Sequence, residues 1–511
     1  MKGITKMIAT QALVASLMSA GLISGATAAG AALGERGAPA SQQSTPVVTG
    51  PVTGGHGLPT LGPPVPNTAL PTLGPAVPNT AFDLADVGYT SEEYFLSGSA
   101  TAYSSSAPLT PDGEWTAQKA GTAPYTTRIV THRPSNPKKF NGTVVVEWLN
   151  VSGDSDVSPI WVISHNEMIR DGFAWVGVSA QSTGVSSLQA ADPDRYGSLS
   201  HPGDSYSYDI LSQASQVLRK PTNYHALGGL EAKRVIAAGT SQSASRLVTY
   251  VNAVHPLTKA FDGFLIRSRR RDAEPLSQAP LPAISAPDAT VVRSDLDVPV
   301  LTLQTETDLI GFEYYRARQR DTKHFRLWEV AGTAHGDAYY ADNWADDTGK
   351  GNAEVALLDV TTPPRPPCER LINLGPQYAV EQAALYHLDR WVRRGVTPPR
   401  APRLAVEAGP TPTIKRDEYG NALGGIRTPL VDVPIATIRG DGNLGPRPCP
   451  NFGSTAPFDD ATLASLYPSH AAYVAKFNRA TDEAAKRGFL LRPEAKSLKT
   501  AAAASSIGAG N

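Results

Sequence analysis

The chain has 511 residues, of which 18% are charged, and its formal net charge at pH 7 is −1. A chain of this length can bury a large hydrophobic core, and its modest charged fraction argues against a largely disordered protein. Because there is no broad excess of basic residues, we do not expect nucleic acid to be a partner.

The N-terminus has the pattern of an export signal. Lys2 and Lys6 precede a mostly apolar stretch, and the small residues Ala-Thr-Ala that end at Ala28 suit a signal peptidase. We expect residues 1–28 to form a signal peptide, and the mature protein to be secreted or periplasmic with no stable membrane span. An uncleaved membrane anchor is the alternative interpretation.

Residues 29–81 are rich in Pro, Gly, Thr and Ala. They contain a tandem repeat, LPTLGPPVPNTA at 58–69 and LPTLGPAVPNTA at 70–81. Two such copies are too few for a solenoid, and proline at this density favours an extended chain. We predict a linker here, or a duplicated strip that lies on the surface of the following domain.

From Phe82 onward, strand-like and helix-like segments alternate. A helix is predicted from Pro159 to Arg170, because proline suits the first turn and Gly172 can end the helix. This alternation predicts an α/β fold with a mostly parallel central sheet flanked by helices, which binds ligands at the carboxyl ends of its strands. The strands are predicted at 92–103, 123–134, 143–150, 173–180, 234–239, 260–266, 298–308 and 324–335.

The C-terminal part of the chain is more mixed. We place one domain at 82–495, including a C-terminal extension, and a flexible tail at 496–511. An amphipathic helix is predicted at 378–394, and two helices within 457–488. The 336–376 segment and the region beyond residue 396 are candidates for a lid over the active site.

The segment GTSQS is the strongest candidate for a catalytic motif. Ser241 lies between Gly239 and Ser243, after a predicted strand and before a predicted helix, which is the context of a nucleophile elbow. The backbone N–H of Gln242 would then lie at the helix N-terminus, where it can stabilise an oxyanion. The similar segment GDSYS, which contains Ser205, does not follow a strand, so we do not expect it to be nucleophilic.

A nucleophilic serine needs a histidine base and a carboxylate that orients the histidine. Asp308 follows one predicted strand and His335 follows the next, so the order Ser241, Asp308, His335 is the order that this fold requires. Glu306 is the alternative acid, because it follows the same strand as Asp308.

The second oxyanion donor is expected in the loop after the strand at 143–150. The backbone N–H groups of Val151 and Ser152 are the candidates. The loop lacks the HGGG form of lipases, so the choice between these two donors stays open.

The chain has two cysteines, Cys368 and Cys449. In an exported protein an isolated pair is a candidate disulfide, and two separate buried thiols are the alternative. No cysteine spacing typical of a zinc site is present, and the proposed chemistry requires neither a metal nor a cofactor.

A basic run, RSRRRD, occupies residues 267–272. It follows a predicted strand, near the edge of the sheet where the catalytic residues are expected. The run could contact an anionic substrate, but a solvated loop is the more usual outcome for such a run.

The folded part of the chain resembles the exported proteins known as "alpha/beta hydrolase domain-containing protein". The resemblance covers about residues 85–495 and implies an α/β-hydrolase fold and a serine hydrolase mechanism, without a substrate. The repeat at 58–81 is not part of it. The motifs that it rests on are VVVEWLNVSG, YGSLSHPGDSYSYDILSQA, AAGTSQSASRL, LQTETDL, GTAHGD, CERLINLGPQYAVEQAALYHLDRWVRRGVTPPRAPRL and FGSTAPFDDATLASLYPSHAAYVAKF.

Together these patterns predict an exported serine hydrolase that cleaves a carboxylic ester through an acyl-enzyme. The expected partner is a small-molecule or polymeric ester. An amidase or peptidase, a lactonase and a polyester depolymerase could use the same triad. A non-catalytic binding protein with a hydrolase-like fold is the alternative from a different class.

Overall fold

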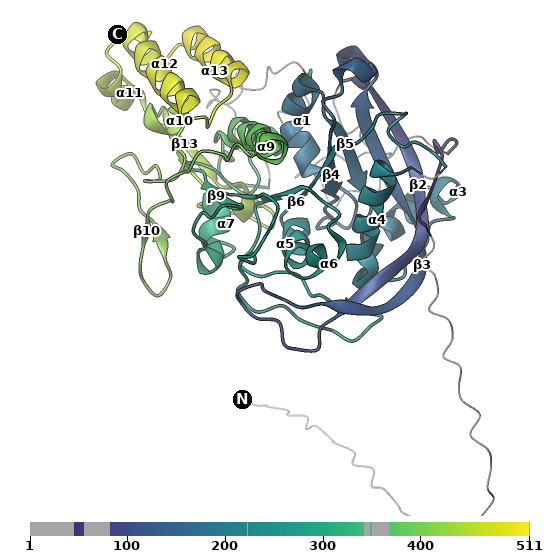
Figure 1. Ribbon diagram of the computed structural model, residues 1–511. Helices are drawn as coiled ribbons and strands as arrows, with labels where there is room; N and C mark the ends of the chain where they lie inside the picture. The colour runs from purple at the N-terminus through teal and green to yellow at the C-terminus, as the bar shows by residue number, and fades with distance from the viewer. Residues whose placement is uncertain (1–44, 56–81, 222, 342–347, 350–366, 510–511) are drawn as a thin grey trace, which may run out of the picture. The chain divides into compact units, whose positions relative to one another are not determined.

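The computed structural model describes residues 45–55, 82–221, 223–341, 348–349 and 367–509 (Figure 1). The predicted signal peptide and the tandem repeat lie outside these described residues. The described part of the predicted linker contains a short strand, β1, which pairs with the second strand of the main sheet. The domain boundaries therefore stay predictions.

A nine-stranded sheet forms the centre of the fold (Figure 1). Its strands follow the order β1-β2-β3-β5-β4-β6-β7-β8-β9. The pairs from β5 through β9 are parallel and the pairs among β1, β2, β3 and β5 are antiparallel, which confirms the predicted mostly parallel sheet. The strand bounds are β1 Val47–Thr49, β2 Tyr89–Ser104, β3 Gln118–Pro134, β4 Thr143–Trp148, β5 Ala174–Val178, β6 Arg234–Thr240, β7 Gly263–Arg267, β8 Val300–Gln304 and β9 Phe325–Glu329.

Helices cover both faces of the sheet because the central strands are apolar on both faces. All residues of β4 are buried, and its side chains alternate between two separate cores. Val144 and Val146 pack in the core that contains Leu211 and Leu247 of two helices. Val145 packs in the other core, with the helices α1 and α9. The helix bounds before residue 342 are α1 Pro159–Asp171, α2 Ser182–Ala191, α3 Pro193–Tyr196, α4 Ser207–Arg219, α5 Gln242–Thr249, α6 His255–Thr258, α7 Glu306–Ile310 and α8 Ala338–Ala341.

Helix α1 shows how local sequence sets the bounds of an element. It begins at Pro159 and is followed by Gly172, whose φ of 74° closes the helix in the left-handed conformation, as predicted. Its first N–H groups donate to the buried Glu147 carboxylate of β4, from Ile160 at 2.9 Å and Trp161 at 3.0 Å. These hydrogen bonds join β4 to α1, the two elements that the loop at 150–156 connects.

The C-terminal region adds helices and two small two-stranded sheets. The amphipathic helix predicted at 378–394 is confirmed as α9, and the two helices predicted within 457–488 are confirmed as α11 and α12. None of the described helices is long and apolar enough to cross a membrane. The element bounds are α9 Gln377–Arg394, β10 Val406–Glu407, β11 Thr413–Ile414, α10 Pro429–Asp432, β12 Ala436–Arg439, β13 Ser454–Pro457, α11 Asp460–Leu466, α12 His470–Lys486 and α13 Arg492–Ala504.

The expectation of a loose tail from residue 496 is wrong as far as Ala504. Helix α13 extends to that residue and packs on α12, with Leu498 and Ala502 buried beside Phe477. Alanine has the highest helix propensity, so an alanine-rich end with one apolar face folds once a neighbouring helix covers it.

Candidate active site

Ser241 lies on a sharp turn between β6 and α5. Its backbone has φ 58° and ψ −118°, a conformation that residues other than glycine rarely adopt. Its N–H donates to Arg267 O at 3.0 Å, and its carbonyl accepts from Ser245 N–H at 3.0 Å. At Gly239 a Cβ atom would lie 3.0 Å from both the Leu247 side chain and the Ser243 carbonyl, so the turn needs a residue without a side chain there.

Ser243 has a role in this turn that the sequence did not reveal. Its hydroxyl donates to Thr240 O at 2.8 Å and accepts from Thr240 N–H at 3.1 Å. The hydroxyl therefore closes the turn around Ser241 from the helix side. Nucleophile elbows usually have a second glycine at this position.

Asp308 and His335 form a direct pair. His335 Nδ1 lies 2.6 Å from Asp308 Oδ1, and the carboxylate is fully buried. The other oxygen, Oδ2, accepts from Thr305 N–H at 2.8 Å in a capping box that begins α7. The Phe312 ring packs edge-on against the imidazole, with ring centroids 4.7 Å apart. The ring of His335 is thus held on two sides.

The environment of Asp308 favours its ionised form. Burial by itself raises the pKa of this carboxyl group. The charge and hydrogen bond of His335, together with the hydrogen bonds from Thr305, outweigh burial and leave the pKa below its usual value. A carboxylate at this place can fix the tautomer of His335 with Nε2 free for the substrate side.

The three predicted catalytic residues follow the carboxyl ends of β6, β8 and β9. These strands belong to one parallel sheet, in which β6 and β8 lie on either side of β7 and β9 lies beyond β8. No hydrogen bond joins the Ser241 hydroxyl to His335 among the described residues. Arg267, at the end of β7, connects the two instead: its carbonyl accepts from Ser241 N–H, and its Nη2 lies 3.5 Å from His335 O. Catalytic hydrogen bonds are often loose without substrate.

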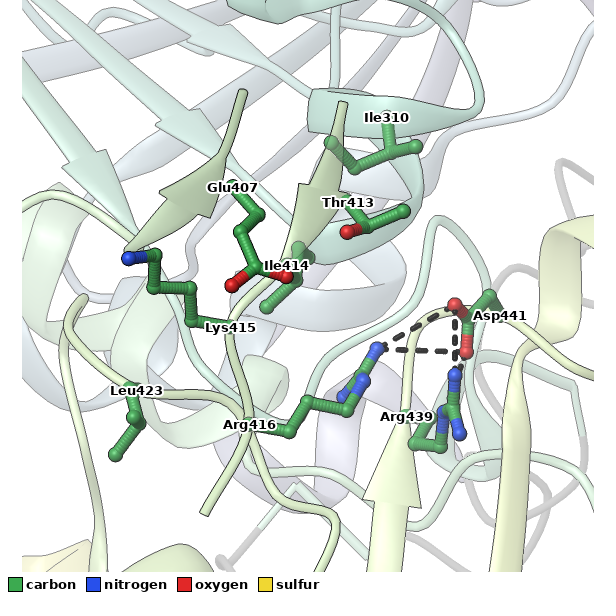
Figure 2. Close-up of a pocket in the computed structure, with 9 residues that line it drawn as sticks. All are labelled: Ile310, Glu407, Thr413, Ile414, Lys415, Arg416, Leu423, Arg439 and Asp441. Atoms are coloured by element: carbon green, nitrogen blue, oxygen red, sulfur yellow. Dashed lines mark hydrogen bonds and ion pairs between the residues drawn. The ribbon is translucent and has the colours of Figure 1, made fainter. Parts of the chain in front are cut away.

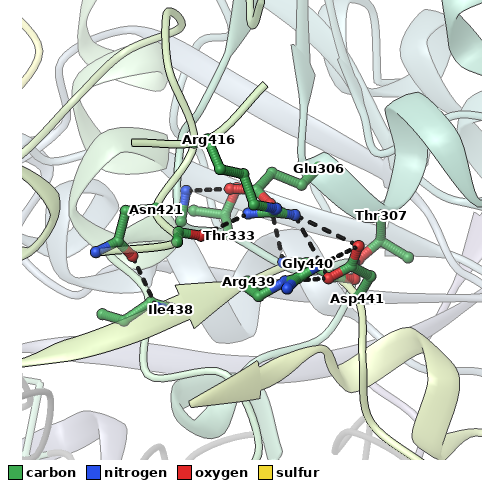
Figure 3. A network of polar contacts seen from close by, with 12 residues as sticks. Glu306, Thr307, Thr333, Arg416, Asn421, Ile438, Arg439, Gly440 and Asp441 are labelled. Carbon is green, nitrogen blue, oxygen red and sulfur yellow. Dashed lines mark hydrogen bonds and ion pairs between the residues drawn. The ribbon is translucent and has the colours of Figure 1, made fainter. Parts of the chain in front are cut away.

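The alternative acid, Glu306, faces away from the His335 ring. Its Oε1 accepts from Gly332 N–H at 2.6 Å, and its Oε2 lies 3.1 Å from Arg416 Nη2 and 3.2 Å from Gly440 N (Figure 3). Burial raises the pKa of Glu306, and the Arg416 guanidinium opposes this shift. The structure therefore assigns the contact with His335 Nδ1 to Asp308.

The backbone N–H groups expected to stabilise the oxyanion differ in whether they already donate a hydrogen bond. Ser152 N–H donates to the Asn150 side chain at 2.8 Å, so this predicted donor is already used. Val151 N–H has no acceptor among the described residues. Gln242 is the first residue of α5, where N–H groups have no partner within the helix. Asn150 also donates to Thr240 O at 2.9 Å, which fixes the loop against the turn that carries Ser241.

The basic run at 267–272 is not simply a solvated loop, because Arg267 and Arg269 are buried although Arg270 is exposed. Arg267 is buried and pairs with Glu381 at 2.6 Å. Arg269 is buried as well and donates to the carbonyls of Arg270 and Arg271. Hydrophobicity patterns cannot distinguish a buried structural arginine such as Arg267 from an exposed one, because its partner Glu381 is distant in sequence.

A pocket of ≈ 480 Å³ lies beside α7 rather than over the predicted catalytic residues (Figure 2). Neither Ser241 nor His335 lines it. It combines apolar side chains with charged ones of both signs. The lining residues are Ile310, Glu407, Thr413, Ile414, Lys415, Arg416, Leu423, Arg439 and Asp441.

The two cysteines form the predicted disulfide. Cys368 Sγ and Cys449 Sγ are bonded across a sequence separation of 81 residues. Within the described part of the chain, no group of three or more His, Cys, Asp or Glu residues could hold a metal ion.

A mostly parallel sheet, a serine on a turn with positive φ and an Asp–His pair at the same sheet edge together define an α/β hydrolase. The family model described as "Alpha/beta hydrolase domain" matches residues 48–500. The chain belongs to this family, which confirms the resemblance found in the sequence.

Solved structures show similarity in fold alone. Esterase Est22 is 14% identical over 52% of this chain and 79% of its own, with a TM-score of 0.29. XC6422 from Xanthomonas campestris, an a/b serine hydrolase without lid, is 13% identical over 48% of this chain and 90% of its own, with a TM-score of 0.27. At these values the likeness supports no argument about activity. No curated protein matches the chain.

Proposed function

We propose that the protein is a serine hydrolase that cleaves a carboxylic ester. The observation that supports this most directly is the pairing of the buried Asp308 with the partly buried His335, 2.6 Å apart, at the sheet edge where Ser241 occupies a strained turn. These residues follow their strands in the order expected of a nucleophile, acid and base in this fold.

In the proposed mechanism, Ser241 Oγ attacks the ester carbonyl carbon while His335 Nε2 accepts its proton. The tetrahedral oxyanion accepts hydrogen bonds from the N–H groups of Gln242 and Val151. The intermediate collapses, the alcohol leaves with the proton from His335, and an acyl-enzyme remains. Water, deprotonated by His335, then releases the carboxylic acid and restores Ser241. Asp308 stabilises the imidazolium in both steps.

We further propose that the protein acts outside the cytoplasm. The N-terminal pattern ending at Ala28 suits an export signal. The disulfide between Cys368 and Cys449 is compatible with an oxidising compartment. Mass spectrometry of the mature N-terminus in extracellular or periplasmic fractions tests this proposal, and an intact Met1 in the cytosolic fraction contradicts it.

A serine-directed fluorophosphonate probe tests the catalytic proposal. We expect wild type to be labelled and Ser241→Ala to lose both labelling and ester hydrolysis. Ser205→Ala is the matched control, since Ser205 is buried and its hydroxyl contacts Gln278; it should retain both activities. A panel of p-nitrophenyl esters and matching anilides separates esterase from amidase. Labelling that persists in Ser241→Ala, or a wild type that neither reacts nor cleaves any ester, contradicts the proposal.

A further inference from the structure

The residues just before Asp308 contact the loop that carries His335. Glu306, Thr307 and Asp308 are consecutive in the first turn of α7, and all three side chains are buried. The proposed chemistry uses only Asp308. The other two side chains contact the backbone of Gly332 and His335, and both also contact the C-terminal region at Gly440 (Figure 3).

Thr307 bridges His335 to the C-terminal region with a single hydroxyl. His335 N–H donates to Thr307 Oγ1 at 3.1 Å, and the same hydroxyl donates to Gly440 O at 2.5 Å. The hydroxyl thus both accepts and donates a hydrogen bond, and the residue is only 6% exposed. Because the hydroxyl donates its proton to Gly440 O, it can serve His335 N–H only as an acceptor.

Glu306 holds the start of the same loop. Its carboxylate accepts from Gly332 N–H, three residues before His335, and from Gly440 N–H. Its backbone N–H donates to Thr333 O at 3.2 Å. Gly440 must be a glycine for this approach: a Cβ atom there would lie 2.4 Å from Glu306 Cβ and 2.6 Å from Thr307 N.

Further residues of the C-terminal region complete the support. Arg416 balances the buried Glu306 charge and also contacts Asp441 at 3.4 Å. From the other side, Asn373 donates to Gly332 O at 3.2 Å and to Arg439 O at 2.9 Å. The loop before His335 is therefore held between α7 and the strand β12.

We propose that Glu306 and Thr307 are positioning residues for His335. Three consecutive side chains hold three points of one loop: Glu306 its start at Gly332, Thr307 the His335 backbone, and Asp308 the imidazole ring. The residues from Arg416 to Asp441 then support the catalytic base through these contacts. This inference rests on the proposed serine hydrolase function.

Thr307→Val tests the proposal because it removes the hydroxyl and keeps the shape. A small displacement of a catalytic group is costly, so we expect kcat for ester hydrolysis to fall about 10- to 100-fold with little change in KM. Thr307→Ser should restore kcat. Glu306→Gln, which places an amide among N–H donors, should also lower kcat. Thr143→Val is the matched control: Thr143 is also buried and its hydroxyl also accepts one hydrogen bond and donates one, from Arg234 Nε and to Asp389, but it lies at the start of β4, away from the carboxyl ends of the strands.

The control should lose stability comparable to that lost by Thr307→Val, yet keep kcat within about twofold of wild type. A second readout is independent of turnover: the Nδ1–H proton signal of His335 in the 15N-histidine-labelled protein, assigned by its loss in His335→Ala. We expect this signal to shift or broaden in Thr307→Val and Glu306→Gln, and not in Thr143→Val. An unchanged signal in both variants overturns the positioning roles, whether or not wild type cleaves esters. A wild type without labelling or turnover overturns the proposed function alone.

Discussion

At the scale of single residues, the pKa values of two carboxyl groups only two positions apart, Asp308 and Glu306, are shifted in opposite directions. Burial raises the pKa of both Asp308 and Glu306. At Asp308 the His335 charge and several hydrogen bonds reverse that shift, whereas at Glu306 the Arg416 charge reduces it without reversing it. The carboxylate that contacts the proposed base is therefore the one stabilised in its charged form.

Asp308→Asn is expected to lower kcat/KM by about 10⁴-fold, because an amide at this site no longer stabilises the imidazolium or fixes its tautomer. Glu306→Gln should cost far less, about 10- to 100-fold, since it acts through position alone. Steady-state kinetics on an activated ester, with circular dichroism to verify folding, measures both. Equal losses in the two variants would contradict the assignment of Asp308 as the acid.

A buried histidine far from the active site predicts loss of stability in acid. His255 is 1% exposed, packs edge-on against Phe264 with centroids 5.0 Å apart, and has no hydrogen-bond partner for its ring nitrogens among the described residues. Burial, assisted by Lys259, lowers its pKa to about 4, while Asp297, 4.0 Å away, opposes the shift. The folded protein thus keeps this ring neutral where the unfolded chain would be protonated.

Below the unfolded pKa of 6.5, the unfolded chain binds a proton that the folded protein does not, so the free energy of unfolding falls as pH falls towards 4. The expected slope is about 1.4 kcal/mol per pH unit for this group. His255→Phe should remove this contribution, so its stability relative to wild type rises between pH 6.5 and pH 4.5. Urea unfolding at several pH values measures this; a constant difference between the two proteins would contradict the prediction.

At the scale of elements, the turn between β6 and α5 is stabilised from three sides. Ser243 contacts both backbone groups of Thr240, Asn150 donates to the same carbonyl, and Arg267 accepts from Ser241 N–H. A backbone conformation that is unfavourable for serine persists only where surrounding contacts determine it. These contacts come from α5, the loop after β4 and the end of β7.

Ser243→Ala should therefore destabilise the protein by about 1–3 kcal/mol, because the buried Thr240 N–H loses its acceptor. We also expect slower labelling of Ser241 by a fluorophosphonate, since the turn is less well fixed. Ser465→Ala is a control, because Ser465 bonds to Thr462 O within the exposed end of helix α11. Urea unfolding and the rate of labelling measure the two effects; a Ser243→Ala protein equal to the control in both would contradict the role of this hydroxyl.

The elements that sequence predicts well are those whose signals are local. Pro159 and Gly172 bound α1, and the apolar run at 143–150 contains β4. Strand order predicted an acid after β8 and His335 after β9, whereas the choice of Asp308 over Glu306 follows only from the contact in the structure. The roles of Thr307 and Gly440 could not be predicted, because their contact spans 133 residues and neither residue type is distinctive. The same holds for Arg267, whose partner Glu381 lies in a distant helix.

At the scale of the whole molecule, the disulfide joins two C-terminal segments, one of which contacts the loop that carries His335. Cys368 and Cys449 lie in a small core with Phe452. Asn451 O accepts from Gly336 N–H at 3.0 Å, directly after His335. The C-terminal region thus supports the His335 loop at two places. Gly440 bonds to Glu306 and Thr307, which contact the loop before and at His335, and Asn451 bonds to Gly336 directly after it.

Replacing both cysteines should affect stability more than catalysis. The disulfide closes a loop of 81 residues, and in the chain-entropy model Cys368→Ser with Cys449→Ser costs about 4 kcal/mol of unfolding free energy. We expect a smaller loss in kcat, because Thr307 and Asp308 still hold His335 when the contact at Gly336 loosens.

Urea unfolding of wild type with and without a reductant, beside the double variant, measures the loss of stability. Ester hydrolysis well below the unfolding transition measures the loss of kcat. If the reduced wild type matches the double variant in stability, the bond itself accounts for the loss. An oxidised wild type no more stable than the variant would contradict this prediction, and a loss of kcat as large as that of Thr307→Val would place the disulfide, rather than α7, as the main support of the base.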